Sequence, residues 1–487
     1  MEAEQTRPPT LVEAIVPIAG LMLLVAASYY LFGDASISGP TQVALVFATL
    51  IGVFVGRRCG HTLEALNAAA VASVSSGIGA IFILFAVGAL IGTWAMSGTL
   101  VAMVYYGLQV LSPHYFYATA AIMTAIVSAS IGTSWTTVGT VGIGLMGISQ
   151  TMGLDPAITA GAVISGAYVG DTSSPVSDTA NLAAGVTGTK LYHHLFETVL
   201  ISGLAILIAL AVFWTFRSEG QFEPGDTMAK IEAAFRITPW LFLPLLLVAL
   251  LAFYKFTPFT AIFSGALAGG LLAVIIAPDR VIAFAGGAED VPTGIALLKG
   301  TWLALASGYK STTGVPALDQ LASRGGMASM LNTIWLVITA LAFGGIVEKA
   351  GILERFIQPI TRWAKSAGSL VATLVASVFA TNVVTGDQYI ALVLPARMFK
   401  SAFAERGYDP VVLSRTIATS ATPTSALVPW NSCGAYMAAT LGVGTLHYAP
   451  YAVFNYTVPL LTIGLAFAGR RMFQLPPSDV SSDKAPH

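Results

Sequence analysis

The stretch GDTSSPVSDTAN, residues 170–181, interrupts an apolar run, and ATPTSALVPWNS, residues 421–432, interrupts a second one in the other half of the chain. Pro175 and Pro429 in these stretches lie 254 residues apart, and other glycines and prolines recur at the same offset. Backbone that leaves helical hydrogen bonding at membrane depth is tolerated only where protein or a water-filled cavity satisfies it. Because paired interruptions in two halves of a chain are typical of transporter binding sites, the repeat predicts a carrier in a bilayer.

The composition agrees with a membrane location. Of the 487 residues, 55% are hydrophobic and 10% are charged, with a mean hydropathy of +0.77, whereas soluble domains carry about 25% charged residues. A net charge of -1 offers no surface for nucleic acid. Cys59 and Cys433 are too few for a disulfide framework, and the six histidines lack metal-ligand spacing. The sequence therefore predicts an all-α polytopic membrane protein that contacts the lipid bilayer, with no nucleic-acid partner and no resident cofactor.

Apolar runs of about 20 residues suffice to cross roughly 30 Å of hydrocarbon. Spans are expected at 11–32, 40–56, 76–97, 100–111, 192–215, 238–255, 259–277, 330–348 and 447–469. The predicted organisation comprises N-terminal scaffold helices (1–75), a first repeat core (76–190), scaffold helices with a polar linker (191–329), a second repeat core (330–445), a C-terminal transmembrane helix (446–475) and a disordered tail (476–487).

Positive charge predicts the orientation of the chain. Arg57 and Arg58 follow the second span, and basic residues near short loops mark the cytoplasmic side, so the N-terminus is expected in the cytoplasm. Residues 64–189 contain no Lys or Arg, whereas basic residues flank the corresponding part of the second half. The equivalent loops are therefore expected on opposite sides of the membrane, which predicts an inverted structural repeat.

Each repeat is expected to contain one hairpin and one broken helix. Segment 368–400 has basic residues at both ends, so the chain enters and leaves on one side and forms a re-entrant hairpin with its tip at 381–387. By symmetry, 114–150 is the opposite hairpin, with its tip at 130–135. A pair of kinked full spans is the alternative. The broken transmembrane helices are expected at 156–186 and 410–442, because proline removes a backbone donor and interrupts a helix.

Three carboxylates in these apolar segments are the candidate ion- and proton-coupling groups: Asp171, Asp178 and Asp387. An intramembrane carboxylate is costly unless it is neutralised, paired or bound to a cation. Burial favours its protonated form and a bound cation favours its charged form, so one carboxylate can exchange a proton for a metal ion. The same three residues are expected to bind Na⁺ transiently.

Neutral polar residues at the interruptions are expected to complete the site, because hydroxyl, amide and carbonyl oxygens suit hard cations. They are Thr133, Ser134, Ser173, Ser174, Ser177, Asn181, Asn382, Thr385, Thr424, Ser425 and Asn431. Asp155 and Asp409 each precede a proline and are expected to cap helices instead. Glu197 is left open as a functional or a boundary residue, and Arg415 as an interfacial anchor or a partner of a substrate carboxylate.

Several motifs together carry a family resemblance. They are Gly132-Thr133-Ser134-Trp135, Gly170-Asp171 with Ser174-Pro175, Ser177-Asp178-Thr179 with Asn181-Leu182, Gly386-Asp387-Gln388-Tyr389, Leu394-Pro395 with Arg397-Met398-Phe399, Leu413-Ser414-Arg415-Thr416, and Pro429-Trp430-Asn431 with Cys433-Gly434. Over roughly residues 50–465, the chain resembles the NhaC-type Na⁺/H⁺ antiporter family. The resemblance implies membership of the ion-transporter superfamily, a homodimer with a scaffold and an elevator-type transport domain, and a place in the bacterial inner membrane.

The chain departs from the family pattern at two places. Thr172 stands where the family usually has a Lys, and Ala418-Thr419 stands where it usually has Glu-Asp. Both signs of charge are lost together, so the resemblance predicts the fold more firmly than the substrate.

The leading hypothesis is secondary active Na⁺/H⁺ antiport by alternating access, without enzymatic activity and with Na⁺ and H⁺ as cargo. The alternative is a Na⁺- or H⁺-coupled carrier of a small organic acid or amino acid, bound at helix N-termini around Ser134, Ser174 and Asn431. A membrane aspartyl protease fits poorly, because Val384 stands where its Gly-x-Gly-Asp motif has the first glycine. A passive channel is a further alternative, but its function would require neither the inverted hairpins nor the titrating carboxylates that the sequence predicts.

Overall fold

The computed structural model describes residues 6–216, 224–287, 292–313, 319, 322–355 and 366–474. Within these ranges the chain forms helices and no β-strand. In this described part of the chain, eight helices are long and apolar enough to cross a membrane, or up to ten if each of two bent helix pairs counts as one span. The chain is therefore a multi-pass membrane protein, as its composition predicts. The expected disordered tail at 476–487 and the first residues of the polar linker lie outside the described residues.

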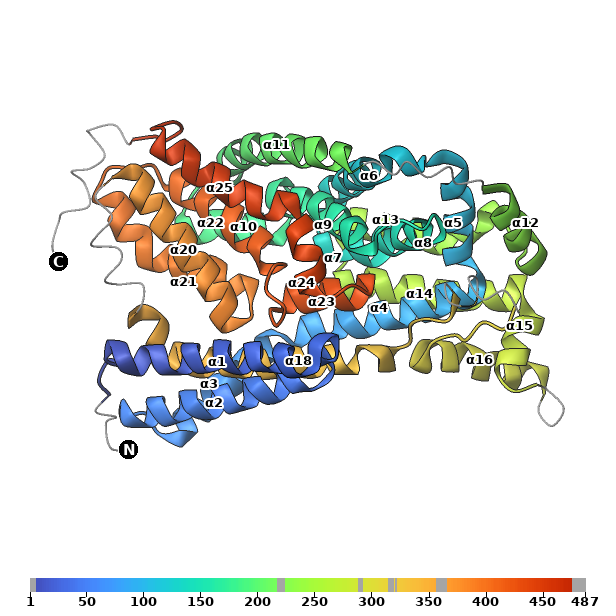
Figure 1. Cartoon of the computed structure of the whole chain (residues 1–487), viewed down its shortest axis with the longest axis horizontal. Coiled ribbons are helices and arrows are strands. Elements are labelled where there is room, and N and C mark those ends of the chain that lie inside the picture. Colours follow the sequence, from blue (N-terminus) through green and yellow to red (C-terminus); the bar gives the residue numbers. More distant parts are fainter. Residues whose placement is uncertain are drawn as a thin grey trace.

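Figure 1 shows how the helices of the described residues are arranged, coloured in chain order. The first half contains α1 (Leu11–Phe32), α2 (Pro40–Arg58), α3 (Leu63–Ser76), α4 (Ile78–Ser97), α5 (Thr99–Val110), α6 (Phe116–Ile131), α7 (Ser134–Thr137), α8 (Ile143–Thr151), α9 (Pro156–Ser173), α10 (Asp178–Thr187) and α11 (Leu191–Thr215). The second contains α12 (Pro224–Ala234), α13 (Leu243–Phe253), α14 (Pro258–Ile276), α15 (Pro278–Phe284), α16 (Thr293–Ser307), α18 (Leu331–Lys349), α20 (Ala367–Thr385), α21 (Gln388–Ala404), α22 (Pro410–Ser425), α23 (Ser432–Leu441), α24 (Thr445–Tyr448) and α25 (Val453–Phe467).

Most expected spans coincide with single helices. The matching helices are α1, α2, α4, α11, α14 and α18. The expected spans at 238–255 and 447–469 instead belong to bent helix pairs, and the one at 100–111 is the short helix α5. Helix α3 has 14 residues and occupies a segment where the hydropathy predicts no span.

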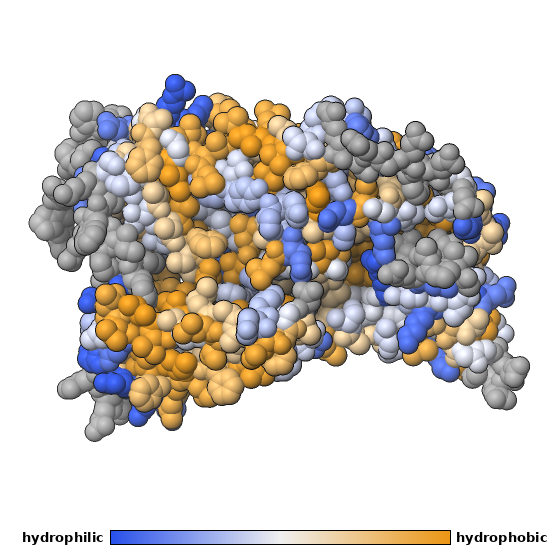
Figure 2. Space-filling model, in the orientation of Figure 1, coloured by the Kyte–Doolittle hydropathy of each residue, from blue (hydrophilic) through white to orange (hydrophobic). Residues whose placement is uncertain are grey.

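Two groups of helices can be distinguished, and they meet where α18 packs against α20. Helix α18 packs against α2 and α3, and α1 packs against α2, along the lower left edge of Figure 1. Above them, α20, α21 and α22 pack together, and α11 and α25 pack on one another and on α9 and α22. Figure 2 shows a broad apolar area over α1 and α2, where Leu23, Phe47 and Phe54 are exposed. Such a surface suits contact with lipid rather than water.

Two helices end inside the predicted hairpin tips. Helix α6 stops at Gly132 with φ 82°, and α20 stops at Gly386 with φ 66°. Both glycines adopt the left-handed conformation that commonly ends a helix, because they have no Cβ to clash. A new helix begins two residues after each glycine, at Ser134 and at Gln388. Thr133 and Asp387, between glycine and helix, are extended.

The broken helices also form where the sequence predicts them. Residues 174–177 separate α9 from α10, and residues 426–431 separate α22 from α23. Asp155 accepts hydrogen bonds from the first turn of α9, and Asp409 does the same for α22, so the predicted caps are confirmed. Pro423, inside the second interruption motif, lies within α22 and does not end it.

Helices α6 and α9 approach each other closely through glycines. A Cβ added at Gly170 would lie 2.1 Å from the carbonyl carbon of Ser128. The Ser128 hydroxyl donates to the Ala167 carbonyl across this contact, and the Ser174 hydroxyl donates to the Ala129 carbonyl at 2.9 Å. This contact places the end of α9, and with it Asp171, beside the turn between α6 and α7.

Replacing Gly170 by Ala is expected to force these two backbones apart. Overpacking of a tight contact costs about 1–3 kcal/mol of unfolding free energy, measurable as a lower midpoint of thermal unfolding in detergent. Gly185→Ala in α10 is the matched control, because its Cβ would meet open space, and alanine favours a helix by about 0.5–1 kcal/mol. Equal midpoints for the two variants would contradict the close α6–α9 contact.

Candidate functional site

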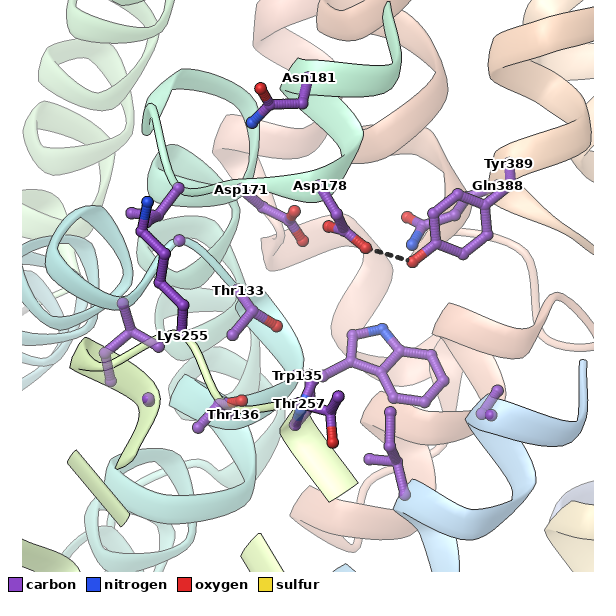
Figure 3. Close-up of a pocket in the computed structure, with 18 of the residues that line it drawn as sticks. Thr133, Trp135, Thr136, Asp171, Asp178, Asn181, Lys255, Thr257, Gln388 and Tyr389 are labelled. Atoms are coloured by element: carbon purple, nitrogen blue, oxygen red, sulfur yellow. Dashed lines mark hydrogen bonds between the residues drawn. The ribbon is translucent and has the colours of Figure 1, made fainter. Parts of the chain in front are cut away.

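A cavity of about 600 Å³ is lined by side chains from both halves of the chain. The candidate coupling residues Asp171, Asp178 and Asp387 all line it, and so do Thr133 and Asn181. Figure 3 shows Asp171 and Asp178 side by side above Thr133, with Tyr389 facing Asp178 from the other half. The wall of the cavity therefore contains the start of α10, the turn between α6 and α7 and the start of α21.

Asp171 is the most completely enclosed carboxylate of the cavity, at 3% exposure. One of its oxygens accepts from the backbone N–H of Ser134 at 3.3 Å and from the Ser134 hydroxyl. The other lies 3.1 Å from the Thr179 hydroxyl and 3.4 Å from the Ser177 hydroxyl. Hydroxyl oxygens both donate protons and present lone pairs, so these groups can stabilise a carboxylate or coordinate a cation beside it.

Asp178 lies at the first position of α10 and is exposed to the cavity. The Tyr389 hydroxyl donates a hydrogen bond of 2.6 Å to one of its oxygens, drawn as a dashed line in Figure 3. Its other oxygen accepts from the backbone N–H of Thr179 at 2.9 Å. Nearby, the Asn181 amide donates to the Ser177 carbonyl at 2.6 Å, closing the turn that precedes α10.

Asp387 both lines the cavity and caps a helix, although the sequence predicts these two roles for different aspartates. It is 6% exposed and lines the cavity. One of its oxygens also accepts from the backbone N–H groups of Tyr389 at 2.7 Å and Ile390 at 3.0 Å. Asp387 therefore caps α21 as Asp155 and Asp409 cap their helices, and differs from them in facing the cavity.

The three aspartates share the cavity without converging on one point. Throughout the described part of the chain, no three side chains of Asp, Glu, His or Cys lie close enough together to hold a metal ion. A cation beside Asp171 would therefore take most of its ligands from hydroxyl and carbonyl oxygens, which are the ligands that hard cations accept.

A buried network outside the cavity lining contains three candidate residues from the second half of the chain: Asn382, Thr424 and Asn431. The Asn382 amide donates to the Ala421 carbonyl at 2.8 Å and to the Thr424 hydroxyl at 3.0 Å. The Asn431 amide donates to the Asn382 side-chain oxygen at 3.2 Å, and Asn431 itself caps α23. These side chains satisfy the backbone at the break between α22 and α23.

Other candidate hydroxyls also bond to backbone. Ser174, Thr385 and Ser425 donate to the carbonyls of Ala129, Thr381 and Thr422, respectively. Ser173 is half-buried and lies 3.2 Å from the Thr172 hydroxyl.

Several cavity residues were missed by the sequence analysis. They are Trp135, Thr136, Lys255, Gln388 and Tyr389. Lys255 lies in the turn between α13 and α14 with a φ of 62°, a conformation that is uncommon for a non-glycine residue. The Thr136 hydroxyl and the Gln388 side-chain oxygen are buried without a hydrogen-bond partner. Trp135, Gln388 and Tyr389 belong to the quoted motifs, which was the available signal; no sequence pattern connects Lys255 to the cavity.

Two of the three positions that depart from the motif pattern, Thr172 and Thr419, carry hydroxyls with hydrogen-bond partners, and the third is Ala418. Thr172 is fully buried and donates to the Tyr168 carbonyl at 3.0 Å. Thr419 is also buried and donates to the Arg415 carbonyl at 2.7 Å. Neither side chain lines the cavity.

Arg415 and Glu197 pair with one another away from the cavity. Arg415, on α22, is 1% exposed and lies 2.9 Å from a carboxylate oxygen of Glu197 on α11, which is 2% exposed. The other Glu197 oxygen lies 2.7 Å from Arg471, beyond the end of α25. The alternatives left open for Glu197 and Arg415 are thus resolved: both belong to an internal ion-pair network that joins three segments.

Comparisons with known proteins point to one family. The sequence model of the Na⁺/H⁺ antiporter family matches residues 166–470. The Na⁺/H⁺ antiporter NhaC of Alkalihalophilus pseudofirmus is 35% identical over 88% of this chain and 90% of that protein. The malate-2H⁺/Na⁺-lactate antiporter of Bacillus subtilis is 31% identical over 99% of both chains. The arginine/ornithine antiporter ArcD of Halobacterium salinarum is 31% identical over 98% of this chain and 96% of that protein.

Glu197→Gln is expected to destabilise the fold, because it leaves the buried Arg415 guanidinium without its counter-charge. Breaking a buried pair in this way costs about 3–5 kcal/mol, measurable by thermal unfolding. The exposed Glu64→Gln on α3 is the matched control and should change stability by less than about 0.5 kcal/mol. An Arg415→Gln variant of native stability that fails only in solute binding would contradict the structural role.

Proposed function

The chain belongs to the Na⁺/H⁺ antiporter family, and from that membership we propose that it is a secondary active transporter that exchanges Na⁺ for H⁺. The single observation that supports this most strongly is the buried Asp171 carboxylate, which lines a cavity and is surrounded by hydroxyls from two segments. Under this proposal the protein converts no substrate chemically, and Na⁺ and H⁺ are cargo rather than cofactors.

Asp171 provides the exchange chemistry. Burial disfavours a bare carboxylate, so the group is stabilised either by a proton or by a bound cation. The Ser134 hydroxyl donates to the carboxylate. The Ser177 and Thr179 hydroxyls donate to the Asp171 backbone carbonyl at 2.5 and 2.8 Å and also lie near the carboxylate, where their lone pairs can turn toward Na⁺ when it binds. Because the proton and the cation exclude each other, release of one accompanies uptake of the other, which couples the two fluxes.

Asp178 and Asp387 are proposed as further coupling groups, because both line the same cavity. Thr133 and Asn181 would supply neutral oxygens from the cavity wall. The remaining candidates would act indirectly by satisfying the backbone at the helix breaks, which keeps these ends fixed around the cation. They are Ser173, Ser174, Asn382, Thr385, Thr424, Ser425 and Asn431.

The transport cycle is proposed to run by alternating access in an inverted repeat. In support, α6 and α20 end at Gly132 and Gly386, which are 254 residues apart, and α9 and α22 begin at Pro156 and Pro410 with the same offset. An elevator-type motion, a homodimer, and a bacterial inner-membrane location with a cytoplasmic N-terminus follow from the family resemblance and the distribution of basic residues.

A second candidate function is a coupled carrier of a small organic acid or amino acid. The cavity volume of about 600 Å³ falls in the range of small-molecule sites, about 300–1,000 Å³. Lys255 provides a positive charge in the cavity lining that could face a carboxylate. Two relatives are named as antiporters of malate and lactate and of arginine and ornithine.

Asp387→Asn is expected to abolish Na⁺-dependent proton flux in liposomes loaded with a pH-sensitive dye. Asparagine caps helices about as well as aspartate, so the variant keeps the cap on α21 and loses only the charge. Asp409→Asn is the control, because this aspartate caps α22 outside the cavity, and it should exchange normally. Wild-type exchange in Asp387→Asn would remove Asp387 from the coupling site.

Lys255→Met separates the two candidate functions. Removing a positive charge from the cavity should strengthen cation binding, lowering the KM for Na⁺ about two- to fivefold for a charge several ångströms away in a wet cavity. A carrier of organic anions would instead lose uptake of labelled malate, lactate or amino acid. The exposed Lys299→Met on α16 is the control and should change neither. An unchanged KM with no organic uptake would exclude an electrostatic role for Lys255.

A further inference from the structure

Tyr389 contacts two cavity carboxylates at once. Its hydroxyl donates to Asp178 at 2.6 Å, and its backbone N–H donates to Asp387 at 2.7 Å. Tyr389 lies in the first turn of α21, behind the tip of the second hairpin, whereas Asp178 opens α10 in the first half of the chain. Its side chain therefore links the second hairpin to the first broken helix along the cavity wall (Figure 3).

The link continues from Asp178 to Asp171. The Thr179 backbone N–H donates to the Asp178 oxygen that does not accept from Tyr389, at 2.9 Å. The Thr179 hydroxyl donates to the Asp171 backbone carbonyl at 2.8 Å and lies 3.1 Å from an Asp171 carboxylate oxygen. A continuous series of contacts thus runs from Asp387 through Tyr389, Asp178 and Thr179 to Asp171, and it connects the start of α21 with the end of α9.

We propose that Tyr389 is a positioning residue for antiport, and that its hydroxyl competes with the transported cation for Asp178. The inference rests on the proposed Na⁺/H⁺ exchange and adds a residue and a coupling step to it. A cation that coordinates Asp178 displaces the Tyr389 hydroxyl and so breaks a link between α10 and α21. Binding of a cation in the cavity thereby changes the contact that the second hairpin makes with α10.

The competition follows from the hydrogen-bonding state of Asp178. Each of its two oxygens already accepts one donor, and the hydroxyl proton of Tyr389 carries partial positive charge directed at the carboxylate. A Na⁺ ion seeks the same electron density and repels that proton at close range. The Thr179 N–H is fixed in the first turn of α10, whereas the Tyr389 hydroxyl is at the end of a side chain that is 42% exposed. The cation is therefore expected to displace the Tyr389 hydroxyl from Asp178 rather than the Thr179 N–H.

The first turn of α21 can remain intact when this happens. Asp387 caps it through the backbone N–H groups of Tyr389 and Ile390, and these two bonds do not involve the phenol. Release of the hydroxyl therefore loosens the contact between α10 and α21 without unwinding the helix. A purely structural tyrosine would act through its ring, which phenylalanine retains.

Tyr389→Phe tests the proposal directly. We expect the variant to bind Na⁺ about three- to tenfold more tightly, the effect of removing one competing hydrogen bond, in calorimetric titrations of NaCl into purified protein in choline buffer. In liposomes, the KM for Na⁺ should fall and the maximal rate should fall with it, because tighter binding slows release. Tyr456→Phe is the matched control, since its hydroxyl bonds to the Pro450 carbonyl outside the cavity.

A double-mutant cycle with Asp178→Ala completes the test. In the Asp178→Ala background the hydroxyl has lost its acceptor, so Tyr389→Phe should not change the Na⁺ affinity further. Equal or weaker Na⁺ binding by Tyr389→Phe, or the same gain with and without Asp178, would overturn the inference while leaving antiport intact. A wild-type protein that neither binds nor exchanges Na⁺ would overturn the proposed function and this inference together.

Discussion

Helices that stop inside an apolar protein core leave backbone N–H and C=O groups that lipid cannot satisfy, and the rest of this structure depends on how those groups are paired. Ser177 caps α10, Asp387 caps α21 and Asn431 caps α23. Ser174 and Asn382 donate to carbonyls of neighbouring segments. Polar side chains therefore lie at the helix breaks primarily because they satisfy the backbone there. The cavity forms where two such groups of polar side chains meet.

Two buried carboxylates of this protein, Glu197 and Asp171, have contrasting environments. Glu197 is paired with Arg415 and Arg471, so its charge is compensated by fixed cations and holds three segments together. Asp171 is surrounded by the hydroxyls of Ser134, Ser177 and Thr179, which are neutral. Neutral donors stabilise a carboxylate without cancelling its charge, so a proton or a cation can still bind. This contrast explains why a buried ion pair is suited to holding segments together, whereas a carboxylate lined by hydroxyls is suited to exchanging a proton for a cation.

The aspartates can be predicted from the sequence because a carboxylate in an apolar run is conspicuous, and the helix breaks can be predicted because glycine and proline act locally. Asn382, Thr424 and Asn431 are predicted to lie with the aspartates, whereas in the structure they form a buried network beside the cavity. Polar residues within an apolar segment indicate where a helix is interrupted. They do not indicate which side of the interruption faces the cavity. Lys255 was missed for a related reason: its turn reaches the cavity only through the packing of α13 and α14.

The sequence by itself determined that the chain is a helical membrane protein of the Na⁺/H⁺ antiporter family, that two segments in each half are interrupted, and that Asp171, Asp178 and Asp387 lie at those interruptions. These properties follow from composition, helix-breaking residues and motifs, which are local. Only the tertiary structure decided that the three carboxylates share a cavity, and that Tyr389 bonds to Asp178. Such contacts join residues far apart in the chain, and they depend on how helices pack rather than on any pattern within one segment.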